Sequence, residues 1–357
     1  MYFDFKTSYN DDIRLIRRPL SGLFYAIAFG TALFSPLVIS EFYITESSAI
    51  FVLGIIIIGY MISAGMAGLV GLGHAAFVGV GAYTHAILLG AGVPFLISIF
   101  SAIAVCALLG VMLAVISLRL SGLYLAISTL IFALAVEHIL GSWETLTGGY
   151  EGILVPDPII FGTSFASSIN YYYLTLSALV SVIILAANLM RSLSGRALIG
   201  LRDSEQAAAS LGINVLKTKS VAFALSGAVT GFGGALMSHQ IFFITPEAFN
   251  MMLSLQIVLA AVIGGLGSIT GALIGAVVIG WMPELISQIK ALLPVSIRYQ
   301  PGPDLVIYGA VLIGFVLFEP LGLYGRWKKI ENWLLTFPLD RKATFAKTRT
   351  YMKSERV

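Results

Sequence analysis

Few residues of this chain have the types and spacings that catalysis requires. The histidines are dispersed, at His74, His85, His138 and His239, and none belongs to the His-Glu-x-x-His pattern of zinc hydrolases. No Gly-x-x-x-x-Gly-Lys-Ser/Thr run is present to hold the phosphates of ATP, and no Gly-x-Ser-x-Gly run presents a nucleophilic serine. The single cysteine, Cys106, lies in an apolar run and is interpreted as a small hydrophobic residue. We therefore predict a protein that is not an enzyme and that holds no metal ion and no other cofactor.

Ionisable residues inside apolar segments are the next candidates, because a charge in lipid is costly and marks ion or proton pathways. Four residues qualify, namely Glu137, His138, Glu284 and Glu319. All four lie near the ends of apolar segments, where a long side chain can reach water. Two interpretations stay open: a satisfied residue at the membrane interface, or a carboxylate of a proton-coupled transporter.

The segment 194–214 carries the most informative polar pattern. Asp203 or Ser204 can cap the start of a helix, a Glu-Gln-Ala-Ala-Ala run propagates it, and Gly212 suits the left-handed residue that ends it. The predicted helix has about two turns, too few to be stable alone in water. We therefore expect it either to dock on a partner or to lie on lipid headgroups.

The composition indicates the class of protein in which these residues are positioned. The chain of 357 residues is 58% hydrophobic and 11% charged, with a mean hydropathy of +0.94, which argues against a water-soluble protein. The formal net charge is +3, and the basic residues are too few and too scattered to neutralise many phosphates, so no nucleic-acid partner is expected.

Apolar runs long enough to cross a membrane, about 20 residues each, set the predicted architecture. The clearest runs cover residues 20–40, 49–68, 94–117, 122–140, 172–190, 220–238 and 304–319. The regions 74–90 and 252–289 are apolar but interrupted by glycine, and each is expected to hold a short, broken or re-entrant segment. We predict an all-α polytopic membrane helix bundle of about ten segments over 20–319, between a cytoplasmic segment 1–19 and a basic cytoplasmic tail 320–357.

Lysine and arginine sort to one side of this scheme, as they do in cytoplasmic loops. They gather before residue 20, in the connection 191–219 and in the tail, whereas the opposite connections carry acidic residues such as Glu144 and Glu247. Ten crossings with both termini cytoplasmic fit this pattern, with Lys290 and Arg298 as the exceptions. The first apolar run is interpreted as a span and not as a secretory signal. The tail suits an interfacial helix on anionic lipid, and a flexible tail is the alternative.

Glycine patterns suggest an internal repeat. The segment Gly71-Leu72-Gly73 with Gly81-Ala82 recurs in spacing as Gly265-Leu266-Gly267 with Gly275-Ala276, 194 residues later. Transporters are often built from such repeats. Chance matching of glycine-rich helices is the alternative.

A family resemblance emerges when these motifs are taken together. Glu205, Ala207, Ala208 and Gly212 resemble the Glu-Ala-Ala loop of ABC importer permeases. Four further motifs resemble, more narrowly, the permeases of the branched-chain amino acid family of ABC importers: Gly71-Leu72-Gly73-His74-Ala75-Ala76-Phe77, Arg119-Leu120-Ser121-Gly122-Leu123-Tyr124-Leu125-Ala126, Leu146-Thr147-Gly148-Gly149 and Ile263-Gly264-Gly265-Leu266-Gly267-Ser268. The second and third of these are similar to the second, longer permease subunit of that family.

The resemblance implies a five-part importer. Its partners would be a second permease that completes a heterodimer, two cytoplasmic ATPase subunits and an extracytoplasmic substrate-binding protein, with membrane lipid around the permeases. The implied substrates are branched-chain or related amino acids, and urea, amides or small organic acids are the alternatives. The implied location is the plasma membrane of a bacterium or archaeon.

The resemblance also assigns expected roles to residues. Coupling to the ATPase falls to Arg196, Arg202, Glu205, Ala207, Ala208 and Gly212. The alanines would allow close docking, Glu205 would offer its charge to the ATPase, and Arg196 and Arg202 would pair with acidic groups there or with lipid headgroups. Helix breaks that line the pathway, or that simply pack closely, are expected at Gly71, Gly73, His74, Gly264, Gly265, Gly267 and Ser268.

Two departures and two rival functions qualify the expectation. Leu69 and Gly71 stand where the family usually has glutamine and serine, which puts the transported species in doubt. The outer loop 143–171 would meet the binding protein, or it is an ordinary solvated loop. A passive channel would leave the connection 191–219 without a purpose, and a secondary transporter would depend on a membrane carboxylate such as Glu137.

Overall fold

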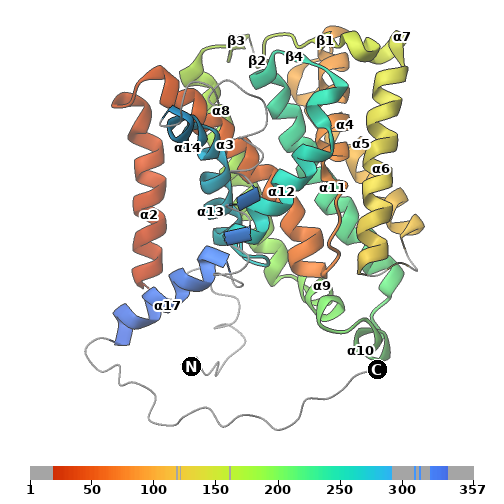
Figure 1. The fold of residues 1–357 in the computed structure, drawn as a ribbon, viewed down its shortest axis with the longest axis vertical. Helices are drawn as coiled ribbons and strands as arrows, with labels where there is room; N and C mark the ends of the chain where they lie inside the picture. The colour runs from red at the N-terminus through yellow and green to blue at the C-terminus, as the bar shows by residue number, and fades with distance from the viewer. Residues whose placement is uncertain are drawn as a thin grey trace.

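The computed structural model describes residues 19–117, 120, 122–160, 162–291, 309–310, 313–314 and 322–336, and helices dominate this part of the chain (Figure 1). The first half contains α2 (Pro19–Phe34), α3 (Glu41–Tyr60), α4 (His74–Gly90), α5 (Phe95–Ile116), α6 (Leu123–Ser142) and α7 (Glu144–Thr147). The second half contains α8 (Ser168–Arg191), α9 (Leu193–Asp203), α10 (Glu205–Ser210), α11 (Val215–Ile241), α12 (Met251–Gly264), α13 (Ile269–Gly280), α14 (Met282–Ala291) and α17 (Gly322–Thr336).

Seven helices of the described residues are long and apolar enough to cross a membrane. They cover Glu41–Met66, Phe95–Ile116, Leu123–Ser142, Ser168–Arg191, Val215–Ile241, Pro246–Gly264 and Ile269–Gln288. Two shorter apolar helices are Tyr25–Leu37 and His74–Gly90. The multi-span helical bundle is therefore confirmed. The count of ten stays a prediction, because most of the expected crossing 304–319 lies outside the described residues, as do Glu319, Arg298 and Arg119.

The structure corrects one predicted boundary and decides between the open alternatives at two others. The connection 191–219 is not a loop with one short helix, since α9, α10 and the first turn of α11 occupy most of it. The region 74–90 forms one unbroken helix, α4, whereas 252–289 is interrupted between α12 and α13. The start of the tail is helical, because α17 covers Gly322–Thr336 and contacts α12 and α13.

The two ends of the bundle differ in character. Helices α9 and α10 lie at the lower end in Figure 1, and α7, the strands and α14 lie at the upper end. The connections at the upper end carry Glu144, Glu151, Asp157 and Glu247, whereas the stretch 191–219 at the lower end carries five basic residues, namely Arg191, Arg196, Arg202, Lys217 and Lys219. This distribution fits the positive-inside pattern, with Lys290 of α14 at the upper end as an exception, and the orientation of the bundle stays a prediction.

The upper end also departs from a purely helical fold. Strand β1 (Ile153–Leu154) pairs antiparallel with β4 (Phe243–Ile244), and β2 (Ile159–Ile160) pairs with β3 (Thr163–Ser164). These connections leave the helices, so their backbone groups must find other partners, and short strand pairs supply them. The β1–β4 pair ties the outer connection after α7 to the end of α11.

Helix α11 forms the centre of the bundle, where it packs against α3, α4 and α5. Small residues allow this close approach: Gly231 lies against the backbone of Gly81 on α4, and a side chain at Gly227 would meet the Cys106 carbonyl of α5 at 2.6 Å. Cys106 is fully buried, as expected for a small hydrophobic residue. Such small-residue faces are how membrane helices pack tightly.

The outward faces of the bundle are apolar. Phe100 and Leu108 of α5 are 67% and 64% exposed, and Leu123 and Ile131 of α6 are 73% and 61% exposed. Large exposed apolar side chains of this number do not suit water. They suit lipid or a partner membrane helix.

The end of α3 contains a π-helix, Met61–Met66, which continues the span before the chain leaves the helix. The N–H of Leu69 turns back and donates to the carbonyl of Ser63 at 2.9 Å, which closes this end. Residues 68–73 are then irregular until α4 begins at His74. π-turns of this kind often occur at functional sites.

Candidate functional site

The lower end of the bundle is built from three successive helix starts, each capped by a polar side chain. The Ser192 hydroxyl accepts from Gly195 N at 3.0 Å and starts α9, and the Ser204 hydroxyl accepts from Ala207 N at 3.2 Å and starts α10. The side chain of Asn214 accepts from Lys217 N at 3.0 Å and starts α11. Each cap satisfies an N–H that has no helical partner. The caps redirect the chain three times within 23 residues, counting from Ser192 to Asn214.

Helix α10 has the form expected from the sequence. It covers six residues, and Gly212 follows it with φ of +84°, a conformation that residues with a side chain adopt only at a cost. Ala207 is exposed, but Ala208 is 2% exposed and packs inward, so only one of the two alanines is available for close docking. Leu211 is 83% exposed at the end of the helix. This exposed leucine was missed, because a leucine at the end of a helical pattern reads as a core residue.

Glu205 forms an ion pair within the chain. Its carboxylate lies 2.9 Å from Nζ of Lys219 on α11. The Lys219 side chain is 4% exposed, whereas that of Glu205 is 47% exposed. The expected role of Glu205 toward an ATPase therefore has to accommodate this internal partner. The sequence contained one signal for it: Lys219 lies in the second turn of a long apolar helix, where a buried ammonium needs an anion.

Arg202 also engages its own chain. Nη1 of Arg202 donates to the carbonyl of Gly65 at 3.0 Å, and the guanidinium lies 3.2 Å from Oδ1 of Asp203. Arg196 lies on the exposed face of α9, and its Nη1 donates to the Arg191 carbonyl at 3.2 Å. The two arginines predicted to serve one purpose thus differ: Arg202 reaches the membrane part of the chain, and Arg196 contacts the end of α8.

A cavity of about 200 Å³ lies beside these residues. Its polar lining comes from Arg202, Glu205 and Lys219, and its remaining walls are Ala67, Gly68, Leu69, Leu120, Gly122, Leu125 and Leu201. The space therefore lies between the start of α10 and the irregular segment after the π-helix.

The first helix break packs closely on α6. Leu72 N donates to the hydroxyl of Thr129 at 2.9 Å, and a side chain at Gly71 would meet that hydroxyl at 3.0 Å. A side chain at Gly73 would lie closer still, directly against the Thr129 carbonyl. Close packing thus accounts for these two glycines in this conformation, and their place in the pathway stays a prediction.

His74 starts α4 in a buried polar cluster. Its Nε2 lies 2.9 Å from the Ser226 hydroxyl of α11 and 3.3 Å from the Ser63 hydroxyl of the π-helix, and the two hydroxyls are 3.2 Å apart. Nδ1 of His74 is buried with no hydrogen-bond partner among the described residues. Intramembrane polar groups are costly and tend to mark function. The sequence could not predict this cluster, because Ser63 and Ser226 lie far apart in the chain.

The second break joins α12 to α13. Gly265 and Gly267 have φ of +114° and +91°, and the Ser268 hydroxyl accepts from Gly271 N at 2.9 Å to start α13. Gly264 lies directly against the backbone of Gly271, so the two helices nearly touch. This tight hairpin follows from the repeated glycines.

The two breaks meet each other. A side chain at Gly65 would lie 2.6 Å from the backbone nitrogen of Gly267, so the end of the π-helix rests on the second break. The matching glycine patterns of the sequence therefore lie at two interruptions that are neighbours in space, which suits an internal repeat.

Two buried histidines form a second polar cluster near the upper end. We call His85 and His239 the histidine pair: their Nε2 atoms are 2.9 Å apart, and Nδ1 of His85 lies 2.8 Å from the Ser98 hydroxyl. One Nε2 must donate and the other must accept, so at least one ring is neutral. The pair joins α4 to α11, and Ser98 adds α5.

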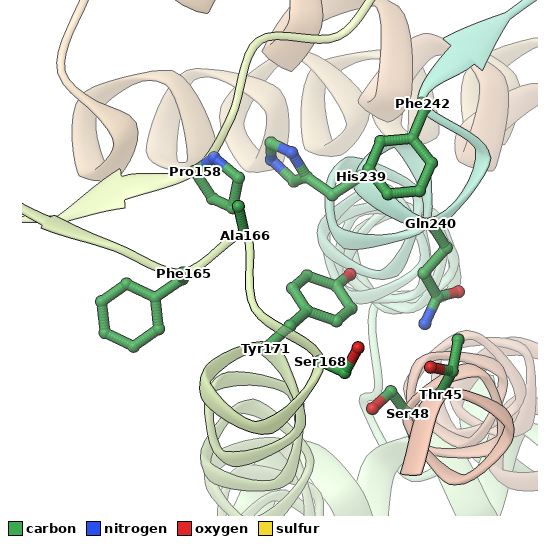
Figure 2. Close-up of a pocket in the computed structure, with 10 residues that line it drawn as sticks. All are labelled: Thr45, Ser48, Pro158, Phe165, Ala166, Ser168, Tyr171, His239, Gln240 and Phe242. Atoms are coloured by element: carbon green, nitrogen blue, oxygen red, sulfur yellow. The ribbon is translucent and has the colours of Figure 1, made fainter. Parts of the chain in front are cut away.

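A small pocket of about 80 Å³ opens beside the histidine pair (Figure 2). Figure 2 shows the His239 ring next to Pro158 and the Gln240 amide turned toward Thr45 and Ser48. Its lining combines hydroxyl and amide groups with apolar side chains such as Phe165 and Phe242.

The candidate membrane carboxylates lie away from these clusters. Glu137 and His138 are on α6 near its upper end, and the His138 ring lies 3.5 Å from the Ser142 hydroxyl. Glu284 is in the first turn of α14 and accepts from Gln288 at 3.1 Å. Neither carboxylate is part of the His74 cluster or the histidine pair.

Comparison with known proteins identifies a family that matches this chain. A model of the family described as "Branched-chain amino acid transport system / permease component" matches residues 43–317, well over half of the chain. The high-affinity branched-chain amino acid transport system permease protein LivM of Salmonella typhimurium is 31% identical over 291 residues. LivM of Escherichia coli K12 is 30% identical over 293 residues. Each alignment covers 74% of this chain and 66% of the relative, slightly less than two thirds of the relative's length.

A second type of permease is also similar. The high-affinity branched-chain amino acid transport system permease protein LivH of Salmonella typhimurium is 29% identical over 209 residues, which cover 55% of this chain and 63% of LivH. No solved structure matches the chain.

Proposed function

Since the chain belongs to the family of permease components of branched-chain amino acid transport systems, we propose that it is a permease subunit of an ABC importer for branched-chain or related amino acids. In this role it forms half of the translocation pathway. It is not an enzyme, and ATP is hydrolysed by partner subunits. Similarity to LivM over 291 and 293 residues favours the longer of two permeases. Similarity to LivH favours a homologous second permease as the other half.

The observation that carries this proposal is α10. It is a short helix with a polar cap, exposed Ala207 and Leu211, and a glycine end, and it projects at the end of the bundle where basic residues gather. So short a helix is unstable by itself. Burial of the exposed Leu211 side chain against a partner lowers the free energy of the complex. A cytoplasmic ATPase is the partner that fits this position. The channel and secondary-transporter alternatives give α10 no such partner.

The remaining partners and the location follow from the same proposal. An extracytoplasmic binding protein delivers the substrate at the upper end, where the outer connection 143–171 lies. The bundle resides in the plasma membrane of a bacterium or archaeon, with both termini in the cytoplasm. Urea, amides and small organic acids stay as alternative substrates, because the substitutions at Leu69 and Gly71 leave the transported species open.

The test is affinity purification of the tagged chain in mild detergent, followed by mass spectrometry. We expect a second permease and two ATPase subunits to co-purify. Leu211→Asp and Gly212→Trp should lose the ATPases and keep the second permease, because both residues lie in the short connection between α10 and α11 and not on a membrane-spanning helix. Leu193→Asp, which changes another exposed leucine of the same segment, serves as the matched control and should keep both. Recovery of the wild-type chain alone, repeated after crosslinking in membranes, would contradict the proposal.

A further inference from the structure

Arg202 stands at the corner between the helices that face the cytoplasm and the helices that cross the membrane. It lies in the last turn of α9, two residues before the Ser204 cap of α10. Nε and Nη2 of its guanidinium each lie 3.2 Å from Oδ1 of Asp203, while Nη1 extends into the bundle. The side chain is 41% exposed, so it is anchored without being enclosed.

The inner end of this side chain binds the first helix break. Nη1 of Arg202 donates at 3.0 Å to the carbonyl of Gly65, which lies in the last turn of the π-helix. Carbonyls at the end of a helix have no N–H partner within it, and a cation there is favourable. The Arg202 guanidinium therefore supplies a partner for one carbonyl at the end of the π-helix.

The backbone after the π-helix packs directly against Arg202. Gly68 has φ of +72°, and a side chain there would meet Cγ of Arg202 at 2.9 Å and its Cα at 3.2 Å. The irregular segment thus passes directly over the arginine, and glycine is required by both the conformation and the contact.

The second break reaches the same guanidinium. A side chain at Gly267 would meet Nη1 of Arg202 at 3.4 Å and the Gly65 carbonyl at 3.4 Å. Arg202 consequently touches the point where the two breaks meet. The neighbouring cavity of about 200 Å³ leaves part of the space between α10 and the bundle unfilled, and the Glu205–Lys219 ion pair is a second contact beside it.

From these contacts we infer that Arg202 is a positioning residue that transmits movement of α9 and α10 to both helix breaks of the membrane bundle. The inference rests on the proposed function and names the route by which the ATPases act on the pathway. The planar guanidinium suits the task, since it holds Asp203 and Gly65 at the same time in a fixed geometry. A lysine at this position cannot make both contacts in the same way.

The test uses the complete importer reconstituted in vesicles and compares Arg202→Met and Arg202→Lys with the wild type. We expect both variants to retain the second permease and the ATPases. Substrate transported per ATP hydrolysed should fall about tenfold in Arg202→Met, the change expected for loss of one hydrogen bond from a charged donor, and by less in Arg202→Lys. Lys217→Met, which changes an exposed basic residue in the first turn of α11 that has no assigned role in coupling, should keep the wild-type ratio.

A second readout separates transmission from general damage. Hydrogen exchange of the segment 65–70 should respond to nucleotide in the wild-type complex. In Arg202→Met it should lose this response, while the response of α10 persists. A wild-type transport ratio in Arg202→Met overturns the inference, and so does an unchanged nucleotide response at 65–70. If Arg202→Met does not assemble, Arg202→Lys decides by the same measurements. Failure of the wild-type chain to bind ATPases would instead refute the proposed function.

Discussion

The stability of α10 depends on its two ends, and each end can be weakened by one substitution. Ser204→Ala removes the hydroxyl that accepts from Ala207 N at 3.2 Å, at a cost of about 1 kcal/mol. Gly212→Ala places a methyl group in open space, with no atom within 4 Å, but forces a side chain into a φ of +84°. That conformation costs about 1–2 kcal/mol. The unfolding equilibrium of α10 should therefore rise about fivefold in the first variant and about fivefold to thirtyfold in the second.

Both changes act on the same short helix, so their costs should add in the double variant, giving about 2–3 kcal/mol. The assay is hydrogen exchange with millisecond mixing, read on the amides of Ala208, Leu211 and Gly212, which donate within this turn. Ser210→Ala is the matched control. It removes a hydroxyl that bonds the Gln206 carbonyl inside the helix and introduces the best helix former, so exchange should be unchanged or slower. Equal exchange rates in the Ser204→Ala and Ser210→Ala variants would refute the capping argument.

Three further outcomes are expected. Glu205→Gln should lower the melting temperature of the purified chain more than Lys219→Met. Glu205→Gln leaves the buried ammonium of Lys219 without this carboxylate, whereas Lys219→Met leaves the half-exposed carboxylate of Glu205 near water. The reverse order of melting temperatures would contradict the ion-pair assignment. Acidification should destabilise the chain, because a second proton on the histidine pair removes the acceptor of its Nε2–Nε2 bond. The stability is thus present at neutral pH and lost as pH falls, and a variant with glutamine at both positions should lose this part of the dependence. Gly81→Val should prevent α4 from packing closely against α11, at a cost of about 1–3 kcal/mol in stability. Gly90→Val, on the same helix, meets nothing within 4 Å and should be tolerated. Equal thermal stability of the two variants would argue against the close contact at Gly81.

Much of the bundle could be predicted, because membrane helices are recognised in a sequence by their length and apolar composition. The short helix at 205–210 was also predictable, since its cap, its alanines and its terminal glycine are local signals. The side-chain contacts at the lower end of the bundle could not be predicted. Glu205 with Lys219, and Arg202 with Gly65, join residues from different helices. A pattern of spacing in one dimension cannot tell which helices are neighbours.

Irregular backbone was predicted only in part. Glycine marked the interruptions near residues 71 and 265, but nothing in Met61–Met66 distinguishes a π-helix from an α-helix. The inward turn of Ala208 and the outward turn of Leu211 were likewise hidden. A helix of six residues is too short for its apolar face to be read from sequence, because its orientation is set by the helices around it.

The π-helix at the end of α3 has a consequence for any change of chain length there. Each residue of an α-helix advances the chain by about 100° around its axis, and a π-turn accommodates one residue more than an α-turn. Deleting a single residue between Met61 and Met66 would convert the bulge to regular helix and leave the span almost as long. The helix after the deletion would also keep nearly the same rotational phase relative to the start of α3, because each residue of the wider π-turn advances the chain by less than the about 100° of an α-helix. A deletion in the regular part of α3 would instead rotate everything after it by about 100°. The π-helix is therefore the part of this span in which the loss of one residue is expected to leave the facing groups in register.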